Sequence, residues 1–218
     1  MSLKISSIIR KFSMALSGLF LVVFLTQHFT INLTSVFSEN IFNEISHFMG
    51  NNFIVQFIFQ PILIFGVVFH FVMGFILEYS NRNSRDINYV SFKGNSNSKW
   101  ISRNMIYSGI VILSFLGLHF YDFWLPEINY KYVEVLPLDQ DRYYEELIHK
   151  FESPIRTLVY SISFVFLALH LYHGFSSSFQ SVGFNNKYSS ALKLFANGFS
   201  IIIPLGFIFI AIFHHLKI

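Results

Sequence analysis

Four histidines lie deep inside long apolar segments of the sequence, where an ionisable side chain is costly and therefore a candidate for function. They are His28, His70, His119 and His170, one in each of the first four apolar segments. Imidazole can bind a metal, transfer a proton or hydrogen-bond to a neighbouring helix. A helix contact would explain any one of them equally well, but four on four successive segments indicate metal or cofactor chemistry.

The composition of the chain is that of a membrane protein. Of its 218 residues, 53% are hydrophobic, 19% aromatic and only 12% charged, whereas a soluble domain carries about 25% charged residues. The absence of cysteine excludes disulfides, thiolate metal sites and iron–sulfur ligation by this chain. The net charge of +3 is modest and scattered, so nucleic acid is not an expected partner.

Five apolar segments are long enough to cross a bilayer, which takes about 20 helical residues. They are residues 12–36, 53–79, 104–124, 154–178 and 191–216. None alternates in the manner of a membrane β-barrel strand. The expected fold class is therefore all-α, a single domain over 1–218 that forms a bundle of five transmembrane helices. Residues 125–153 form the largest predicted loop, with an amphipathic stretch around Arg142–Phe151.

Lysine and arginine are distributed unevenly between the two ends of this bundle. The N-terminus and the loops 80–103 and 179–193 hold ten of the fifteen basic residues, and ten of the twelve acidic residues lie on the opposite side. Because basic residues favour the cytoplasmic side, we expect a cytoplasmic N-terminus and a C-terminus outside. The basic start leads into the first apolar segment without a small-residue cleavage site, so we expect that segment to be retained.

In this orientation the four histidines fall on two levels. His28 and His119 lie at an outer level and His70 and His170 at an inner one, about 9 to 11 residues or roughly 14–16 Å apart along a helix. Two histidines at one depth on different helices form the axial pair of a b-type haem. The sequence thus predicts an outer and an inner haem b, close enough for electron transfer.

Short motifs around the histidines agree with this interpretation. His70 and His170 each begin an H-x-x-x-G stretch, which ends at Gly74 and Gly174. A glycine one turn along the same face leaves room for a porphyrin edge, although close helix packing is the alternative. His173 is a rival ligand, and the shared glycine offset favours His170.

The first and third apolar segments share a second motif. Ser17-Gly18 and Ser108-Gly109 each end ten residues before a histidine. The two matches hint that the first four segments are two related hairpins.

Polar residues at the outer side are candidates for quinone and propionate binding. Glu44 and His47 precede the second segment near the outer haem, where a proton-accepting pair could serve a quinone headgroup; a plain loop role is the alternative. Arg156 at the start of the fourth segment is a candidate donor to haem propionates. The remaining outer histidines are expected at solvated interfacial positions, which is also the alternative for His47. They are His149, His214 and His215.

These residues resemble a known family, the di-haem cytochrome b subunit of succinate:quinone oxidoreductases (succinate dehydrogenase and fumarate reductase), of the cytochrome b558 type. The resemblance covers nearly the whole chain and is closest to the anchors of the Bacteroidetes. It is carried by Phe24-Leu-Thr-Gln-His28-Phe-Thr-Ile-Asn32-Leu33, Leu118-His119-Phe-Tyr-Asp122-Phe-Trp124, His170-Leu-Tyr-His-Gly174, Phe179-Gln180 and Gly183.

The resemblance implies that His28 and His119 ligate the outer haem and His70 and His170 the inner one, and it selects His170 over His173. It also implies two partners on the cytoplasmic face of a bacterial inner membrane, a flavoprotein with covalent FAD and an iron–sulfur subunit. The chain would be the electron-transferring and quinone-reactive subunit, generally with menaquinone, and would not act on succinate alone.

One position departs from the pattern of some fumarate-reducing relatives. These carry a glutamate two residues before the fourth ligand, where this chain has Ala168, so that proton route has no support and the direction of turnover stays open. A di-haem cytochrome of a quinone-linked hydrogenase or formate dehydrogenase is the alternative, since those often place two histidines on one helix. A haem-free transporter or scaffold is a third class.

Overall fold

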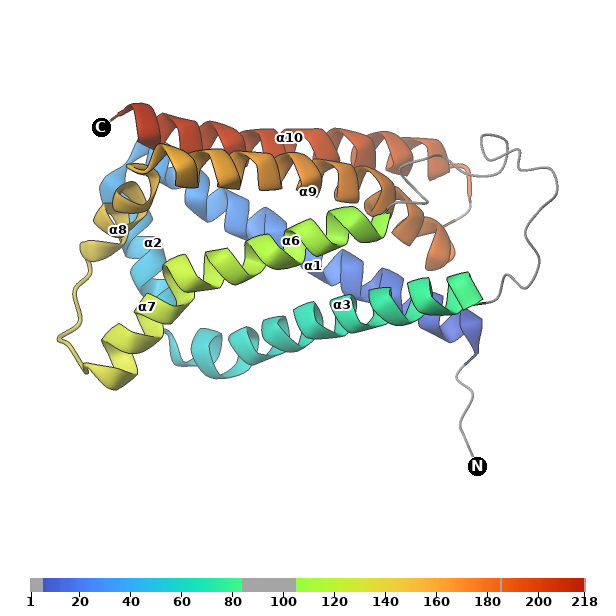
Figure 1. Ribbon diagram of the computed structural model, residues 1–218, viewed down its shortest axis with the longest axis horizontal. Helices are drawn as coiled ribbons and strands as arrows, with labels where there is room; N and C mark the ends of the chain where they lie inside the picture. Colours follow the sequence, from blue (N-terminus) through green and yellow to red (C-terminus); the bar gives the residue numbers. More distant parts are fainter. Residues whose placement is uncertain (1–5, 84–104, 185, 218) are drawn as a thin grey trace.

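The computed structural model describes residues 6–83, 105–184 and 186–217, and every regular element in these ranges is a helix (Figure 1). Five stretches are long and apolar enough to cross a membrane, which confirms an all-α bundle with five membrane-spanning helices. They run Ile8–Phe37, Val55–Asn83, Met105–Val133, Pro154–Ser181 and Ser189–Leu216. Residue 104, where the third predicted span begins, lies outside the described residues. So do some of the charged residues that predict the orientation: Lys4, Arg85, Asp86, Lys93, Lys99 and Arg103.

The spans are built from several consecutive elements, of which η1, η2 and η3 are π-helical turns. In chain order the elements are α1 (Ser7–Phe37), α2 (Glu39–Asn51), η1 (Val55–Phe59), α3 (Gln60–Asn83), α6 (Met105–His119), η2 (Phe120–Trp124), α7 (Leu125–Ile128), η3 (Asn129–Val133), α8 (Arg142–Phe151), α9 (Pro154–Ser181) and α10 (Ser189–Leu216).

Helix α1 crosses the bundle and packs against α2, α3, α9 and α10 (Figure 1). Helices α9 and α10 lie side by side along their length, and α6 packs against α9. Helices α2 and α8 lie across one end of the bundle, near the end of α10, and we call this the α8 end. Helix α1 begins at the opposite end, which we call the N-terminal end. Most of the buried core lies toward the α8 end, among residues such as Phe42, Tyr144, Phe151, Tyr160 and Phe207.

Serine and glycine set the helix boundaries that bring the spans together. Ser38 has extended backbone (φ −155°, ψ 119°) and its hydroxyl accepts a hydrogen bond from the Ile41 amide at 3.3 Å, so it ends α1 and caps α2. Ser153 caps α9 in the same way, with Pro154 at the first helical position. Gly183, at a φ of 94°, follows the end of α9 in the left-handed conformation common after helices.

The third span is longer than the sequence analysis expected. Helical structure continues through residues 125–133, where we expected a loop, and Pro126 does not end it. A proline ring clashes with the carbonyl four residues earlier, and the π turn η2 loosens the backbone immediately before Pro126. The turn η1 stands before Pro61 in the same manner. The amphipathic helix at Arg142–Phe151 is confirmed as α8.

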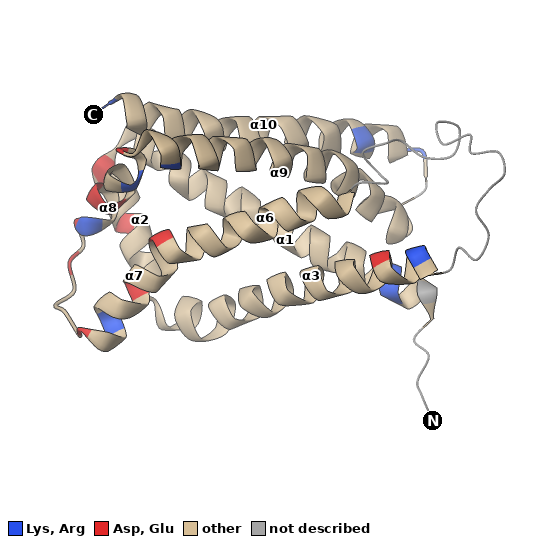
Figure 2. Ribbon diagram, in the orientation of Figure 1, with Lys and Arg blue, Asp and Glu red and all other residues tan. Residues whose placement is uncertain are grey.

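Acidic residues gather at the α8 end, around α2, α7 and α8, whereas lysine and arginine lie at both ends (Figure 2). At the N-terminal end the described part of the chain carries Arg10, Lys11, Glu78, Arg82, Lys187 and Lys193. The charge asymmetry is therefore a property of the folded bundle. The cytoplasmic location of the N-terminal end stays a prediction.

Candidate functional site

Two pairs of histidine rings meet inside the bundle. The ring centroids of His28 on α1 and His119 on α6 are 5.7 Å apart, and those of His70 on α3 and His170 on α9 are 6.3 Å apart. All four side chains are half-buried, and the two rings of each pair lie next to each other. These are the pairs inferred from helix depth, and the ring that faces His70 is that of His170.

The two pairs lie at different levels along the helices. Ser17 of α1 contacts His70 and stands 11 residues before His28 in the chain. Eleven residues of α-helix rise about 16 Å. The levels are thus separated along α1 by the spacing that the sequence predicted.

Serine hydroxyls hold the two rings of the inner pair. The distance from Ser17 Oγ to His70 Nδ1 is 3.0 Å, and that from Ser108 Oγ to His170 Nδ1 is 3.2 Å. These are hydrogen-bond distances. The Ser-Gly motif of the sequence is therefore explained, because each serine binds the histidine on the neighbouring antiparallel helix.

The glycines of the H-x-x-x-G motifs face methionine side chains. A Cβ added at Gly74 would lie 3.6 Å from the methyl carbon of Met14, and one at Gly174 would lie 4.0 Å from that of Met105. Both distances are those of ordinary van der Waals contacts, so packing against these methionines does not by itself require glycine. The role of the two glycines beside a porphyrin edge stays a prediction.

These contacts repeat between the two hairpins. On α1 and α6 the motif is Met-x-x-Ser, and on α3 and α9 it is His-x-x-x-Gly. In each hairpin the serine contacts the histidine and the methionine faces the glycine. The related hairpins suggested by the sequence therefore share contacts as well as residues.

Aromatic rings surround the outer pair. Phe24 stacks on His28 at 5.5 Å and Phe115 on His119 at 5.9 Å between ring centroids, and Tyr160 lies 6.3 Å from His119. Nδ1 of His119 is buried and has no hydrogen-bond partner among the described residues. Buried polar atoms are nearly always paired, and His214 Nδ1 is another buried ring nitrogen without a partner in the described part of the chain.

Both pairs fit the axial ligands of a haem iron. Metal–imidazole bonds of about 2 Å on opposite sides of one iron place the ring centroids about 6 Å apart, and the observed separations are 5.7 and 6.3 Å. The described part of the chain contains no group of three or more His, Asp or Glu that could hold a bare metal ion. A haem needs only two axial ligands from the protein, so two histidines suffice at each level.

A buried ion pair stands beside the outer pair. Asp122, three residues after His119 and within the π turn η2, has a side chain with 0% exposure. Its Oδ1 lies 2.9 Å from Nη2 of Arg156, an ion-pair distance without hydrogen-bond geometry, and its Oδ2 accepts a hydrogen bond of 2.9 Å from the Tyr160 hydroxyl. The guanidinium expected to bind haem propionates is therefore paired with a carboxylate, a partner that the sequence analysis missed.

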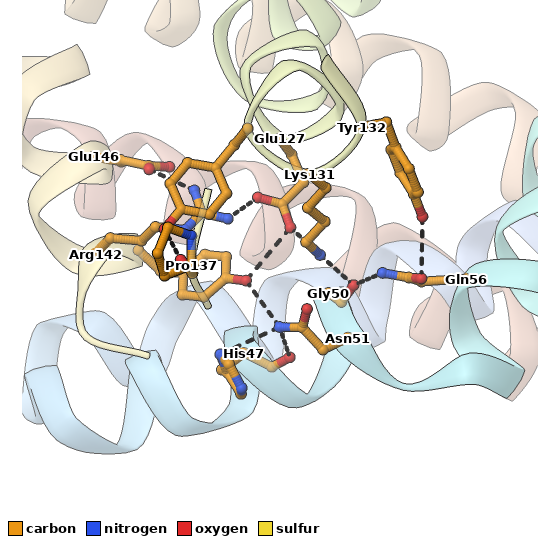
Figure 3. A network of polar contacts seen from close by, with 12 residues as sticks. His47, Gly50, Asn51, Gln56, Glu127, Lys131, Tyr132, Pro137, Arg142 and Glu146 are labelled. Carbon is orange, nitrogen blue, oxygen red and sulfur yellow. Dashed lines mark hydrogen bonds and ion pairs between the residues drawn. The ribbon is translucent and has the colours of Figure 1, made fainter. Parts of the chain in front are cut away.

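Glu44 and His47, the candidate quinone residues, both lie on α2. Glu44 is exposed, and no ion pair joins it to His47 among the described residues. His47 is half-buried, and its Nδ1 accepts a hydrogen bond of 3.2 Å from the Asn51 amide. The Asn51 amide also donates to the Tyr143 hydroxyl, which donates to Glu127, each at 3.4 Å (Figure 3). His47 is thus the end of a polar chain and not half of a pair with Glu44.

The hydrogen bonds between His47 and Glu127 belong to a larger polar network that connects α2, α7 and α8 (Figure 3). Glu127 forms ion pairs with Lys131 and Arg142, and Arg142 also pairs with Glu146 at 2.6 Å. Burial disfavours the Arg142 charge, but the hydrogen bonds to Glu127 and Glu146 hold its pKa above the ordinary value. The network closes the α8 end of the bundle.

Two of the other histidines are not solvated as expected. His214 has 0% exposure, with Nε2 2.8 Å from Ser35 Oγ, because α1 and α8 pack against the end of α10. His215 is half-buried and lies 2.8 Å from the Phe151 carbonyl oxygen. The side chain of His149 is 75% exposed, which agrees with the expectation.

Comparison with family models, curated proteins and solved structures finds no match to this chain.

Proposed function

We propose that this chain is the di-haem cytochrome b membrane-anchor subunit of a succinate:quinone oxidoreductase, which passes electrons between an iron–sulfur subunit and a membrane quinone, of which menaquinone is the expected species. One observation carries the proposal. Two histidine pairs lie at two levels of a membrane bundle, each with the ring separation that a shared iron requires.

The residues of the chain would hold and shield two b-type haems. When bound, haem supplies a reversible one-electron couple between Fe(III) and Fe(II). His28 and His119 would hold the outer haem and His70 and His170 the inner one. The rings of Phe24 and Phe115, which stack on His28 and His119, would shield the outer haem site from water and keep its surroundings apolar.

The two ends of the bundle would meet different partners. The basic N-terminal end, with Arg10, Lys11 and Lys193, is the proposed cytoplasmic docking side for the flavoprotein and iron–sulfur subunits. The α8 end would face the outside of a bacterial inner membrane and serve the quinone. Glu44 and His47 stay candidates there, and His47 is the stronger of the two because it belongs to the hydrogen-bonded chain that includes Tyr143.

A pyridine haemochrome assay on the purified protein tests the proposal. We expect two b haems per chain, with loss of one in His28→Ala and of the other in His70→Ala. His149→Ala is the matched control, because that side chain is 75% exposed, and it should keep both haems. A wild-type chain without haem would refute the proposal and favour a haem-free scaffold.

The same preparation distinguishes the alternative enzyme complexes. His173→Ala should retain both haems, whereas loss of one would indicate a ligand arrangement with two histidines on one helix. In the intact complex succinate should reduce both haems. Reduction by hydrogen or formate, and not by succinate, would identify the hydrogenase or formate dehydrogenase class.

A further inference from the structure

The inner and outer histidine pairs differ in what holds their rings. Both rings of the inner pair have a serine hydroxyl at Nδ1, at 3.0 Å for Ser17 and 3.2 Å for Ser108. In the outer pair, Nδ1 of His119 is buried without a partner among the described residues. Within the described ranges, the polar side-chain contact of His28 is one of 3.5 Å between Nε2 and the Asn32 amide nitrogen, at the limit of a hydrogen bond.

The direction of the inner hydrogen bonds follows from counting protons. A serine hydroxyl has a single proton. Ser17 Oγ donates it to the Met14 carbonyl and Ser108 Oγ to the Met105 carbonyl, each at 2.8 Å. The serine oxygens must therefore accept from the imidazoles. Nδ1 of each inner histidine carries the proton, and Nε2 keeps its lone pair.

This tautomer is the one in which imidazole binds a metal through Nε2. We propose, on the basis of the proposed function, that Ser17 and Ser108 are positioning residues that fix the tautomer and ring orientation of His70 and His170 and lower the reduction potential of the inner haem. A hydrogen bond donated by the distant ring nitrogen makes a ligating imidazole more basic. A more basic ligand stabilises Fe(III) over Fe(II), and hydrogen bonding around the ligands is one of the means by which a protein sets haem potential.

Because the hairpins repeat, a serine hydrogen bond would act on both histidines that hold the inner haem. Met14 and Ser17 on α1 have the same spacing as Met105 and Ser108 on α6. Each serine is anchored by the carbonyl three residues earlier in its own helix. The acceptor is thus held by the helix backbone and does not depend on a solvent molecule.

Redox titration of the holo-protein tests this inference. Ser17→Ala and Ser108→Ala should each shift the inner haem to a more positive potential, on the order of tenfold in the Fe(III)/Fe(II) ratio, which for one electron is about 59 mV. Titration in a His119→Ala background, which should retain only the inner haem, assigns the shift. Ser17→Thr keeps a hydroxyl and should restore the original potential.

Ser114→Ala is the control, because Ser114 lies exposed on α6 with its hydroxyl bonded to the Ile110 carbonyl at 3.0 Å. It should leave both potentials unchanged. An unchanged inner potential in Ser17→Ala and Ser108→Ala, with two haems bound, would overturn the inference and leave the proposed function intact. Loss of the inner haem in Ser17→Ala but not in Ser17→Thr supports it, whereas loss in both assigns the effect to packing and overturns it. A wild-type chain without haem overturns both.

Discussion

Replacing Arg156 by glutamine should destabilise the bundle more than removal of any surface charge. Arg156 pairs at 2.9 Å with Asp122, whose side chain has 0% exposure and retains only the Tyr160 hydrogen bond when the guanidinium is lost. Breaking a buried ion pair by removing one partner costs about 3–5 kcal/mol. Because Arg156 is itself 31% exposed, and because its contact is not a well-aligned hydrogen bond, we expect the lower end, about 3 kcal/mol.

A double-mutant cycle separates the pairing from other effects of the substitution. Asp122→Asn removes the buried charge and leaves Arg156 near solvent, so it should cost about 1–2 kcal/mol. The double variant should cost about 2 kcal/mol less than the sum of the single variants, since the second substitution removes the charge that the first leaves unpaired. Tyr160→Phe should cost about 1.5–3 kcal/mol, the range for a hydrogen bond to a charged group.

Equilibrium unfolding in mixed detergent micelles, followed by circular dichroism, measures these free energies. Arg82→Gln is the matched control, because the Arg82–Glu78 pair at 2.6 Å is 60% and 30% exposed. An exposed ion pair contributes little to stability, so this variant should unfold almost like the wild type. Additive effects in the cycle, with a coupling below about 0.5 kcal/mol, would refute the pairing of Asp122 with Arg156.

Two further predictions concern packing and pH. Gly206→Ala should destabilise the chain by about 1–3 kcal/mol, because an added Cβ would overlap the ring of Phe29. Gly198→Ala on the same helix is the control: its added Cβ would meet no atom within 4 Å, so it should be neutral or stabilising by up to about 1 kcal/mol. Unfolding in the same micelles measures both. Burial and the Glu127 carboxylate raise the pKa of Tyr143 to about 12, so the stability it contributes is present below the unfolded pKa of about 10 and is lost as the pH rises through 12. The difference in phenolate absorbance between the wild type and Tyr143→Phe should show one transition near pH 12, and a difference transition near pH 10 instead would contradict the burial of Tyr143.

The spans and the histidine pairs could be predicted because both depend on one helix at a time. Twenty apolar residues suffice to cross a bilayer, and a constant rise of 1.5 Å per residue converts position into depth. Depth alone was therefore enough to pair His28 with His119 and His70 with His170. Whether these pairs bind haem depends on a group outside the chain, so the ligation stays a prediction.

Features that depend on distant elements could not be predicted. The burial of His214 results from cover by helices far away in the sequence, and the partner of Asp122 is 34 residues further along the chain. Helix α2 was missed because its residues, Glu39–Asn51, mix polar and apolar types over only 13 residues. Its capping residue Ser38 was a signal, since serine before a helix accepts a bond from the first turn. The sequence predicts a loop at Pro126, because the π turn before this proline leaves no mark in the sequence.

The two levels of the bundle differ in their contacts, and under the proposed function they would serve the two ends of an electron path. At the inner level the hairpins repeat the same contacts, Ser17 with His70 and Ser108 with His170. At the outer level the repeat breaks, because only the third span carries a buried carboxylate, Asp122, next to its histidine. A symmetric site needs only to hold a haem and pass one electron at a time. Reduction of a quinone consumes protons as well, so under the proposed function the level that would serve the quinone requires polar groups that the other level does not, and the network of Glu127, Lys131 and Arg142 lies at the α8 end.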